Sequence, residues 1–335
     1  MTREQELISS GLVDAIKQQY NNINYSISDK YFILMADYID SISQLDYEGG
    51  LYLNAMNIAK ILPDALKQVS EENIGGIHGR TDEDRITMNS SLDYETNKLY
   101  FFHELTHAIQ TRIINDQEQC SFYNGKDGMF LTEGATQYTA EILYHVSKGT
   151  NIQYREQSGI VRGQKNHIVN SPLSEYQLNG NILLLMSYSM GIPLNQILAL
   201  GFRSDGRELL KGMYEAFPNN ENKFDGFMFD LEKIYSIDKL IIAGYGNQLA
   251  GIPLNIQMQD GRTFVGNLQI QNELIEKIER DLASNFIANY EPDYIMEYYQ
   301  KVYACLTTER LKQDFMNVIS QVKEIQNETS AGHIM

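Results

Sequence analysis

Two histidines and a glutamate are grouped in the segment YFFHELTHAIQ, residues 100–110. His103 and His107 are four residues apart, so on an α-helix they lie on one face and can direct a ring nitrogen at one point. Glu104 lies about 100° around such a helix, beside the histidines. Zinc lowers the pKa of a bound water to about 7, and a carboxylate can take its proton and pass it to a leaving amine. The spacing therefore predicts a zinc site with Glu104 as general base.

A catalytic zinc site needs three protein ligands and one open position. Glu133 is the candidate third ligand, since it opens the next predicted helix 26 positions after His107, beyond a loop long enough for the chain to reverse. Two antiparallel helices would place it opposite the histidines, and the backbone dipole favours a carboxylate at a helix start. We therefore expect one Zn²⁺ ion held by His103, His107 and Glu133.

The elements that must position these residues can be predicted from periodicity and capping residues. The segment DRITMNSSL, residues 84–92, alternates apolar and polar side chains, which predicts a short strand with one buried face. Asp93 is then the N-cap of a helix over about 94–117, and Thr132 is the N-cap of a second helix over 133–148. The polar segments 118–130 and 149–171 are expected to be loops.

Elsewhere the pattern is mostly helical. The apolar segment 173–191 predicts a buried helix. The segment LNIQMQDGRTFVGNLQIQ, residues 254–271, predicts a β-hairpin with Asp260 and Gly261 as a two-residue turn. The expected fold class is therefore α+β, mostly helical, with a small mixed sheet.

Composition excludes several classes of protein. Hydrophobic residues make up 43% and charged residues 21% of the 335 residues, which is typical of a globular chain. A net charge of −17 disfavours nucleic acids and anionic membranes as partners. The sequence has neither a signal-peptide pattern nor an 18-residue apolar run, so we expect a cytoplasmic protein, with export independent of a signal peptide left open. Cys120 and Cys305 fit no metal or redox spacing and are expected to be reduced thiols.

The segments HELTH (103–107) and EGATQY (133–138) resemble the gluzincins, zinc metallopeptidases with HExxH on one helix and a glutamate ligand on the next. The second segment is similar to the Glu-Gly-x-x-x-Tyr ligand helix of one aminopeptidase group among them. The resemblance implies zinc-dependent hydrolysis of peptide bonds and a zincin-like architecture. In that architecture an edge strand of a small sheet binds the substrate backbone, and two active-site helices and a helical lobe follow. Segment 84–92 stands where the edge strand should be.

The resemblance implies the same roles for the matching residues: His103, His107 and Glu133 as zinc ligands, and Glu104 as general base. Two departures matter. The Gly-x-Met-Glu-Asn segment that anchors a free amino terminus in those aminopeptidases is missing, so aminopeptidase action is not implied. Position 137 is Gln, where some gluzincins have an Asp that orients a histidine ligand.

Peptide hydrolysis passes through an oxyanion, which a donor beside the metal usually stabilises. In gluzincins this donor is a Tyr or His beyond the third ligand. Tyr176 is the preferred candidate, while His167, Tyr138 and Tyr188 stay open.

The expected organisation is an N-terminal helical region over 1–75, a zincin-like catalytic core over 76–215, and a C-terminal helical region over 216–335 that includes the hairpin. The expected partner is a peptide or protein substrate. Two alternatives stay open: a noncatalytic zinc-bearing protein that binds peptides or regulates, and a helical structural protein without metal. An open coordination position beside Glu104 is the feature that separates these possibilities.

Overall fold

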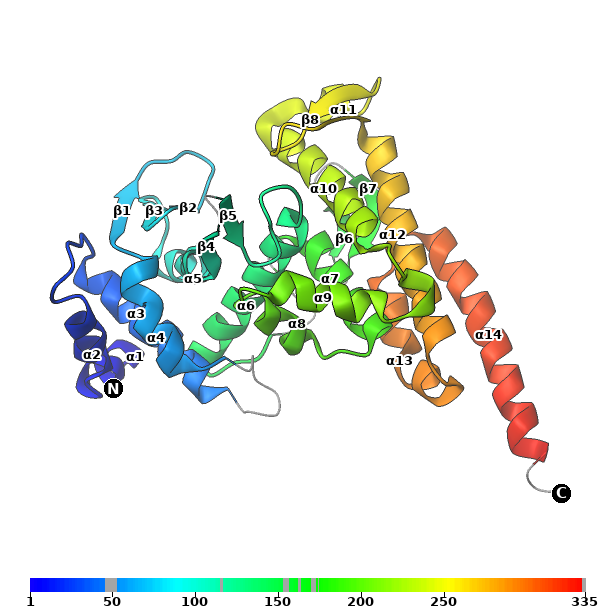
Figure 1. Ribbon diagram of the computed structural model, residues 1–335, viewed down its shortest axis with the longest axis horizontal. Coiled ribbons are helices and arrows are strands. Elements are labelled where there is room, and N and C mark those ends of the chain that lie inside the picture. Colours follow the sequence, from blue (N-terminus) through cyan, green and yellow to red (C-terminus); the bar gives the residue numbers. More distant parts are fainter. Residues whose placement is uncertain are drawn as a thin grey trace. The chain divides into compact units, whose positions relative to one another are not determined.

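The computed structural model describes residues 1–332 apart from 46–52, 115–116, 153–156, 162–163, 170–172 and 174 (Figure 1). The chain divides into two compact units. The first comprises Met1–Ser121, Ala135–Gln153 and Leu198–Gly206, and the second comprises Phe122–Gly134, Tyr154–Ile197 and Arg207–Met335. One division falls inside a single continuous helix, α6, which therefore contributes residues to both units.

Short helices, a small sheet and a hairpin form the first unit. Its elements are α1 (Arg3–Ser9), α2 (Leu12–Gln19), α3 (Asp29–Gln44), α4 (Ala55–Ala65), β1 (Gln68–Glu72), β2 (Gly79–Asp82), β3 (Arg85–Asn89), α5 (Tyr94–Gln110), β4 (Thr111–Ile114) and β5 (Gln117–Cys120). Helix α6 (Met129–Ser147) follows, and α8 (Leu194–Leu200) also ends in this unit.

The second unit is mostly helical, with two hairpins. Its elements are β6 (Gln157–Val161), β7 (Gln164–Val169), α7 (Gln177–Met190), α9 (Gly206–Glu215), the short η1 (Pro218–Asn220), α10 (Phe224–Leu240), the π-helix η2 (Ile241–Tyr245), α11 (Gly246–Leu249), β8 (Leu254–Gln257), β9 (Thr263–Gly266), α12 (Leu268–Asn289), α13 (Pro292–Cys305) and α14 (Glu309–Gly332). The expected class, mostly helical with a small mixed sheet, is thus confirmed.

The three-stranded sheet places the predicted strand differently from expectation. Strand β3 lies in the middle, parallel to β1 and antiparallel to β2. Its residues from Ile86 to Asn89 are all buried, because neighbours on both sides and helices cover it. The prediction that segment 84–92 is the edge strand, with one buried face, is therefore wrong. The outer strand next to α5 is β2, from Gly79 to Asp82.

The two predicted site helices form, with shifted ends. Asp93 is the N-cap of α5, and its Oδ1 accepts a hydrogen bond from the Thr96 backbone N–H at 3.0 Å. Helix α5 ends at Gln110, where the β4–β5 hairpin begins, rather than near 117. Helix α6 already begins at Met129, so Thr132 is not its N-cap. The Thr132 hydroxyl instead accepts from the Phe122 backbone N–H at 3.2 Å.

Other predicted elements can now be compared with the structure. The buried helix over 173–191 is confirmed as α7, whereas the predicted loop over 149–171 contains the β6–β7 hairpin. The hairpin over 254–271 is confirmed as β8–β9. Its loop has three residues rather than two, since Met258 N–H donates to the Arg262 carbonyl at 2.8 Å and Gly261 adopts a φ of 87°.

Helix α5 is anchored by buried polar contacts as well as by its apolar face. The Lys98 ammonium, only 6% exposed, pairs with the buried Asp37 carboxylate of α3, which also accepts from Arg3 at 2.9 Å. Farther along, Tyr38 and Thr106 hydroxyls are hydrogen-bonded at 2.9 Å. These contacts fix α5 against α3 and therefore fix the face that carries the histidines.

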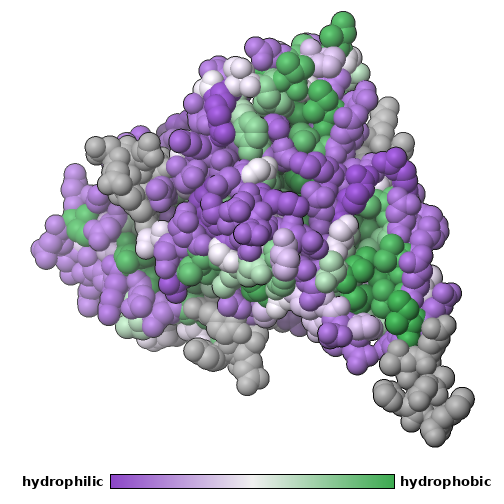
Figure 2. Space-filling view, turned by 45° about the vertical axis from the view of Figure 1, so that its right-hand side comes forward, coloured by the Kyte–Doolittle hydropathy of each residue, from purple (hydrophilic) through white to green (hydrophobic). Residues whose placement is uncertain are grey.

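The surface is largely hydrophilic on the face in Figure 2, as the net charge of −17 predicts. Apolar residues gather at the top of that view, the end at which Figure 1 labels β8 and α11. The exposed large apolar side chains of this part of the sequence are Ile242, Tyr245, Ile252 and Val265. Among the described residues no single helix is both long and apolar enough to cross a membrane; α7 and α8 meet that test only as a bent pair.

Candidate metal centre

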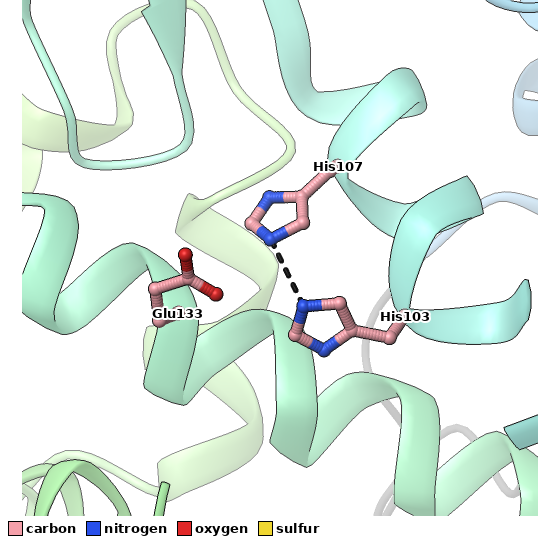
Figure 3. Close-up of side chains that lie close together, drawn as sticks. All are labelled: His103, His107 and Glu133. Atoms are coloured by element: carbon pink, nitrogen blue, oxygen red, sulfur yellow. Dashed lines mark hydrogen bonds between the residues drawn. The ribbon is translucent and has the colours of Figure 1, made fainter. Parts of the chain in front are cut away.

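The structure brings the three predicted metal ligands together. His103 and His107 project from one face of α5, and their Nε2 atoms are 3.1 Å apart. Glu133 comes from α6, and one ligand atom from each of the three residues lies within 4.8 Å of the other two. Figure 3 shows the two imidazoles and the carboxylate turned toward a common space. Glu133 lies in the second turn of α6 rather than at its start, so the dipole argument for its position does not hold.

Hydrogen bonds on α6 define which nitrogen of His103 can bind a metal. The His103 Nδ1 lies 2.8 Å from Gln137 Oε1, and the Gln137 Nε2 donates to Glu141 Oε1 at 2.7 Å. A carboxylate only accepts, so the Gln137 amide must direct its NH₂ toward Glu141 and its oxygen toward His103. Nδ1 of His103 therefore carries the proton, and Nε2 carries the lone pair. All three side chains are buried.

His107 has a similar, longer contact. Its Nδ1 lies 3.5 Å from the Thr136 hydroxyl oxygen, and that hydroxyl donates to Gln110 Oε1 at 3.1 Å. The Thr136 proton is thus used, and its oxygen is left to accept from Nδ1–H. The Cys120 sulfur lies 3.6 Å from the same nitrogen. With the proton on Nδ1, the lone pair of His107 is on Nε2.

These two assignments make the site suited to a cation. With both rings in this tautomer, the Nε2 lone pairs face each other at 3.1 Å and repel unless a positive charge lies beside both. Two nitrogens bound to one tetrahedral zinc at about 2.0–2.1 Å would lie roughly 3.3–3.4 Å apart. Two histidines and a carboxylate are a donor set of catalytic zinc sites, which leave a further position open. The residues present therefore fit a divalent metal ion.

Glu104 is held beside the histidines by the outer strand β2. The Thr81 hydroxyl lies 2.8 Å from Glu104 Oε2 and 3.0 Å from the Glu104 carbonyl oxygen. Gly79 packs so closely that a Cβ there would lie 2.8 Å from Glu104 Cγ. The carboxylate is 7% exposed. The position of the Glu104 carboxylate is thus determined by the Thr81 hydroxyl and by the absence of a side chain at Gly79.

Helix α10 supplies two contacts to α6 that the sequence did not reveal. The Tyr235 hydroxyl donates to Glu133 Oε1 at 3.2 Å. One turn earlier, Glu232 Oε2 accepts from the backbone N–H groups of Gly128 and Met129, each at 3.1 Å, where α6 begins. Burial raises the pKa of Tyr235, and the Glu133 carboxylate adds to this rise, so the hydroxyl stays protonated and can donate.

Burial also raises the pKa of Glu232 to about 7, since the residue is fully covered and the two N–H groups compensate only in part. Glu232 and Tyr235 are three residues apart on one face of α10. Their partners lie about 100 residues away in the sequence. Because α10 carries further polar residues, among them Asp230 and Asp238, no local pattern distinguishes this pair.

The glycine after Glu133 has a packing role. A Cβ at Gly134 would lie 2.7 Å from the Cβ of Asn179, on α7. Asn179 Nδ2 donates to the Phe130 carbonyl at 2.7 Å. Helix α7 therefore packs directly against the turn of α6 that carries Glu133.

The oxyanion candidates lie in different settings. Tyr176 precedes α7, is partly buried and has a left-handed backbone with φ 52°. Its hydroxyl lies close enough to Tyr235 to contribute to the raised pKa of that residue. Tyr138 is buried in α6, and the ring of Tyr188 is tilted against that of Tyr298, with centroids 6.1 Å apart. His167 pairs with Gly159 in the β6–β7 hairpin. The role of Tyr176 stays a prediction.

Comparison with protein-family models, with curated proteins and with solved structures finds no match to this chain. Function must therefore be inferred from the geometry and chemistry of the residues themselves. In that geometry, two histidines, a glutamate and a second glutamate held by β2 form the group of side chains best suited to chemistry.

Proposed function

We propose that this protein is a gluzincin-type metallopeptidase that hydrolyses peptide bonds with one zinc ion held by His103, His107 and Glu133. The observation that carries the proposal is the convergence of two Nε2 atoms and a carboxylate beside Glu104. A purely structural zinc site usually has four Cys or His ligands, and this group of three leaves a position open.

When bound, zinc supplies Lewis acidity toward water and toward a substrate carbonyl. Glu104 accepts the proton of the attacking water and delivers it to the leaving amine. The Thr81 hydroxyl holds the carboxylate in place for both transfers. Tyr235 holds Glu133, and Tyr176 is the proposed donor to the oxyanion.

The outer strand β2 is proposed as the place where the substrate backbone binds. A strand at the edge of a sheet presents backbone N–H and C=O groups, and an extended peptide can add to it as a further strand. Because β2 also touches Glu104 through Gly79 and Thr81, a peptide paired with β2 would lie next to the general base. The sequence predicted that segment 84–92 binds the substrate backbone, and we propose residues 79–82 for this role instead.

The test compares zinc-loaded wild type with Glu104→Gln and Glu95→Gln on a diverse peptide mixture analysed by mass spectrometry. Glu95 lies on the same helix but is exposed and pairs with Lys148. We expect the wild type and Glu95→Gln to cut the same bonds. Glu104→Gln should bind one zinc per chain and lose about 10²–10⁴-fold in rate, the usual contribution of a general base.

Cut positions in that experiment would separate endopeptidase from exopeptidase action. Cleavage that persists in Glu104→Gln would refute the assigned base. An intact mixture with wild type and with bound zinc confirmed would refute the peptidase proposal and favour a noncatalytic zinc-bearing protein.

A further inference from the structure

The second unit contains a cavity of about 790 Å³ that begins at Glu133. Its wall follows one face of α10, including Tyr235 and Lys239, and reaches the loop of the β8–β9 hairpin at Gln257 and Gln259. Because Glu133 is a proposed zinc ligand, a substrate held at the metal would extend directly into this space. The inference below therefore rests on the proposed function.

Lys239 is a cation in the lining of this cavity. The Lys239 ammonium lies 5.0 Å from the centroid of the Tyr235 ring, so cation–π attraction holds it at the wall. Within the described part of the chain no carboxylate forms an ion pair with Lys239, although Lys233 and Lys277 both pair with Asp230. Asp238, beside Lys239 in sequence, accepts from Gln271 at 2.8 Å.

The two acids that line the cavity have partners other than Lys239. Glu133 is committed to the metal and to Tyr235. Glu232 is fully buried, and its Oε2 is occupied by the N–H groups at the start of α6. Gln257 and Gln259, which also line the cavity and are exposed, add amide hydrogen-bond donors.

We propose that this cavity binds a carboxylate of the substrate through Lys239, with the glutamine amides as additional donors. The Tyr235 hydroxyl touches Glu133 and its ring touches the ammonium, so the cation lies within roughly 10 Å of the metal ligand, a span of about three extended residues. The carboxylate would therefore be a C-terminal one, or that of an Asp or Glu side chain, no more than about three residues from the scissile bond.

Peptide binding to the zinc-loaded Glu104→Gln variant tests this, because that variant should hold peptides without cutting them. One arm compares a fluorescent peptide with a free C-terminal carboxylate against its amide. A second arm compares internal Glu with Gln in amidated peptides. Fluorescence anisotropy should show about tenfold or tighter binding of the carboxylate form in at least one arm, which identifies the source.

Adding Lys239→Met should abolish that preference, whereas Lys223→Met, which removes the same charge from the exposed start of α10, should keep it. Equal affinity for acid and neutral forms in both arms would overturn the proposal, as would a preference that survives Lys239→Met. Cleavage is read separately on the wild type. Cleavage without any carboxylate preference overturns only the role of Lys239, and a Lys239-dependent preference without cleavage overturns only the peptidase proposal.

Discussion

Each candidate ligand is oriented by a neighbouring side chain, and this support matters as much as the ligand itself. The pairs are Gln137 with His103, Thr136 with His107, and Tyr235 with Glu133. Such partners fix the ring tautomer or the carboxylate orientation, and losing one typically costs 10- to 100-fold in metal affinity. Gln137 has the strongest position, since Glu141 in turn fixes its amide.

Replacing Gln137 should therefore weaken zinc binding. In Gln137→Met the acceptor for His103 Nδ1–H is lost, and the ring can rotate or change tautomer. We expect zinc affinity, measured by competition with a chelator, to fall about 10- to 100-fold. Gln269→Met is a matched control, because Gln269 makes the same i,i+4 bond to Glu273 at 2.9 Å on the surface of α12. Equal affinities for the two variants would contradict the assigned tautomer.

At the scale of elements, the site depends on how closely β2 lies against α5. Gly79 has ordinary backbone angles, so what its position requires is space rather than a left-handed conformation. A methyl group there would meet Glu104 Cγ at 2.8 Å and Met88 Sδ at 3.1 Å. The strand or the general base would have to move.

Gly79→Ala should therefore reduce catalysis while leaving metal binding intact. A displacement of about 1 Å can cost about 10²-fold in rate, so we expect kcat to fall by 10- to 100-fold with zinc stoichiometry unchanged. Gly76→Ala is the control, since a Cβ at Gly76 meets nothing within 4 Å. Full activity in Gly79→Ala would mean that Glu104 does not depend on β2 for its position.

Elements whose signals are local were predictable from the sequence, and those that depend on distant partners were not. The i,i+4 histidines and the Asp93 cap are local, and both form as expected. The start of α6 is set by the distant Glu232, which accepts from its first N–H groups, so the local cap signal at Thr132 was misleading. Strand order likewise depends on non-local pairing, because β3 lies between β1 and β2. The contact of Tyr235 with Glu133 could not be predicted, because it is made by the packing of α10 against α6. No spacing in the sequence indicates that packing.

At the scale of the whole molecule, a buried acid links stability to pH. Glu279 on α12 is fully buried, and its Oε2 accepts from the Thr307 N–H and hydroxyl, each at 3.0 Å. Burial raises its pKa from 4.5 to about 8. Between these two values the folded chain retains a proton that the unfolded chain has lost. The free energy of unfolding is therefore highest below the unfolded pKa, and this stability is lost as pH rises through the folded pKa.

Glu279→Gln should remove this dependence, because an amide keeps an acceptor for Thr307 and never ionises. The free energy of unfolding of the wild type should fall with rising pH by up to about 1.4 kcal/mol per unit relative to the variant, between the two pKa values. Urea unfolding of both proteins from acid to mildly alkaline pH, with a chelator present to remove metal linkage, measures the difference.

Repulsion from the net charge of −17 also grows with pH, but it is nearly the same in both proteins and cancels in the comparison. Glu273→Gln, on the exposed face of the same helix, should follow the wild type. Parallel curves for wild type and Glu279→Gln would show that Glu279 is ionised in the folded protein throughout this range.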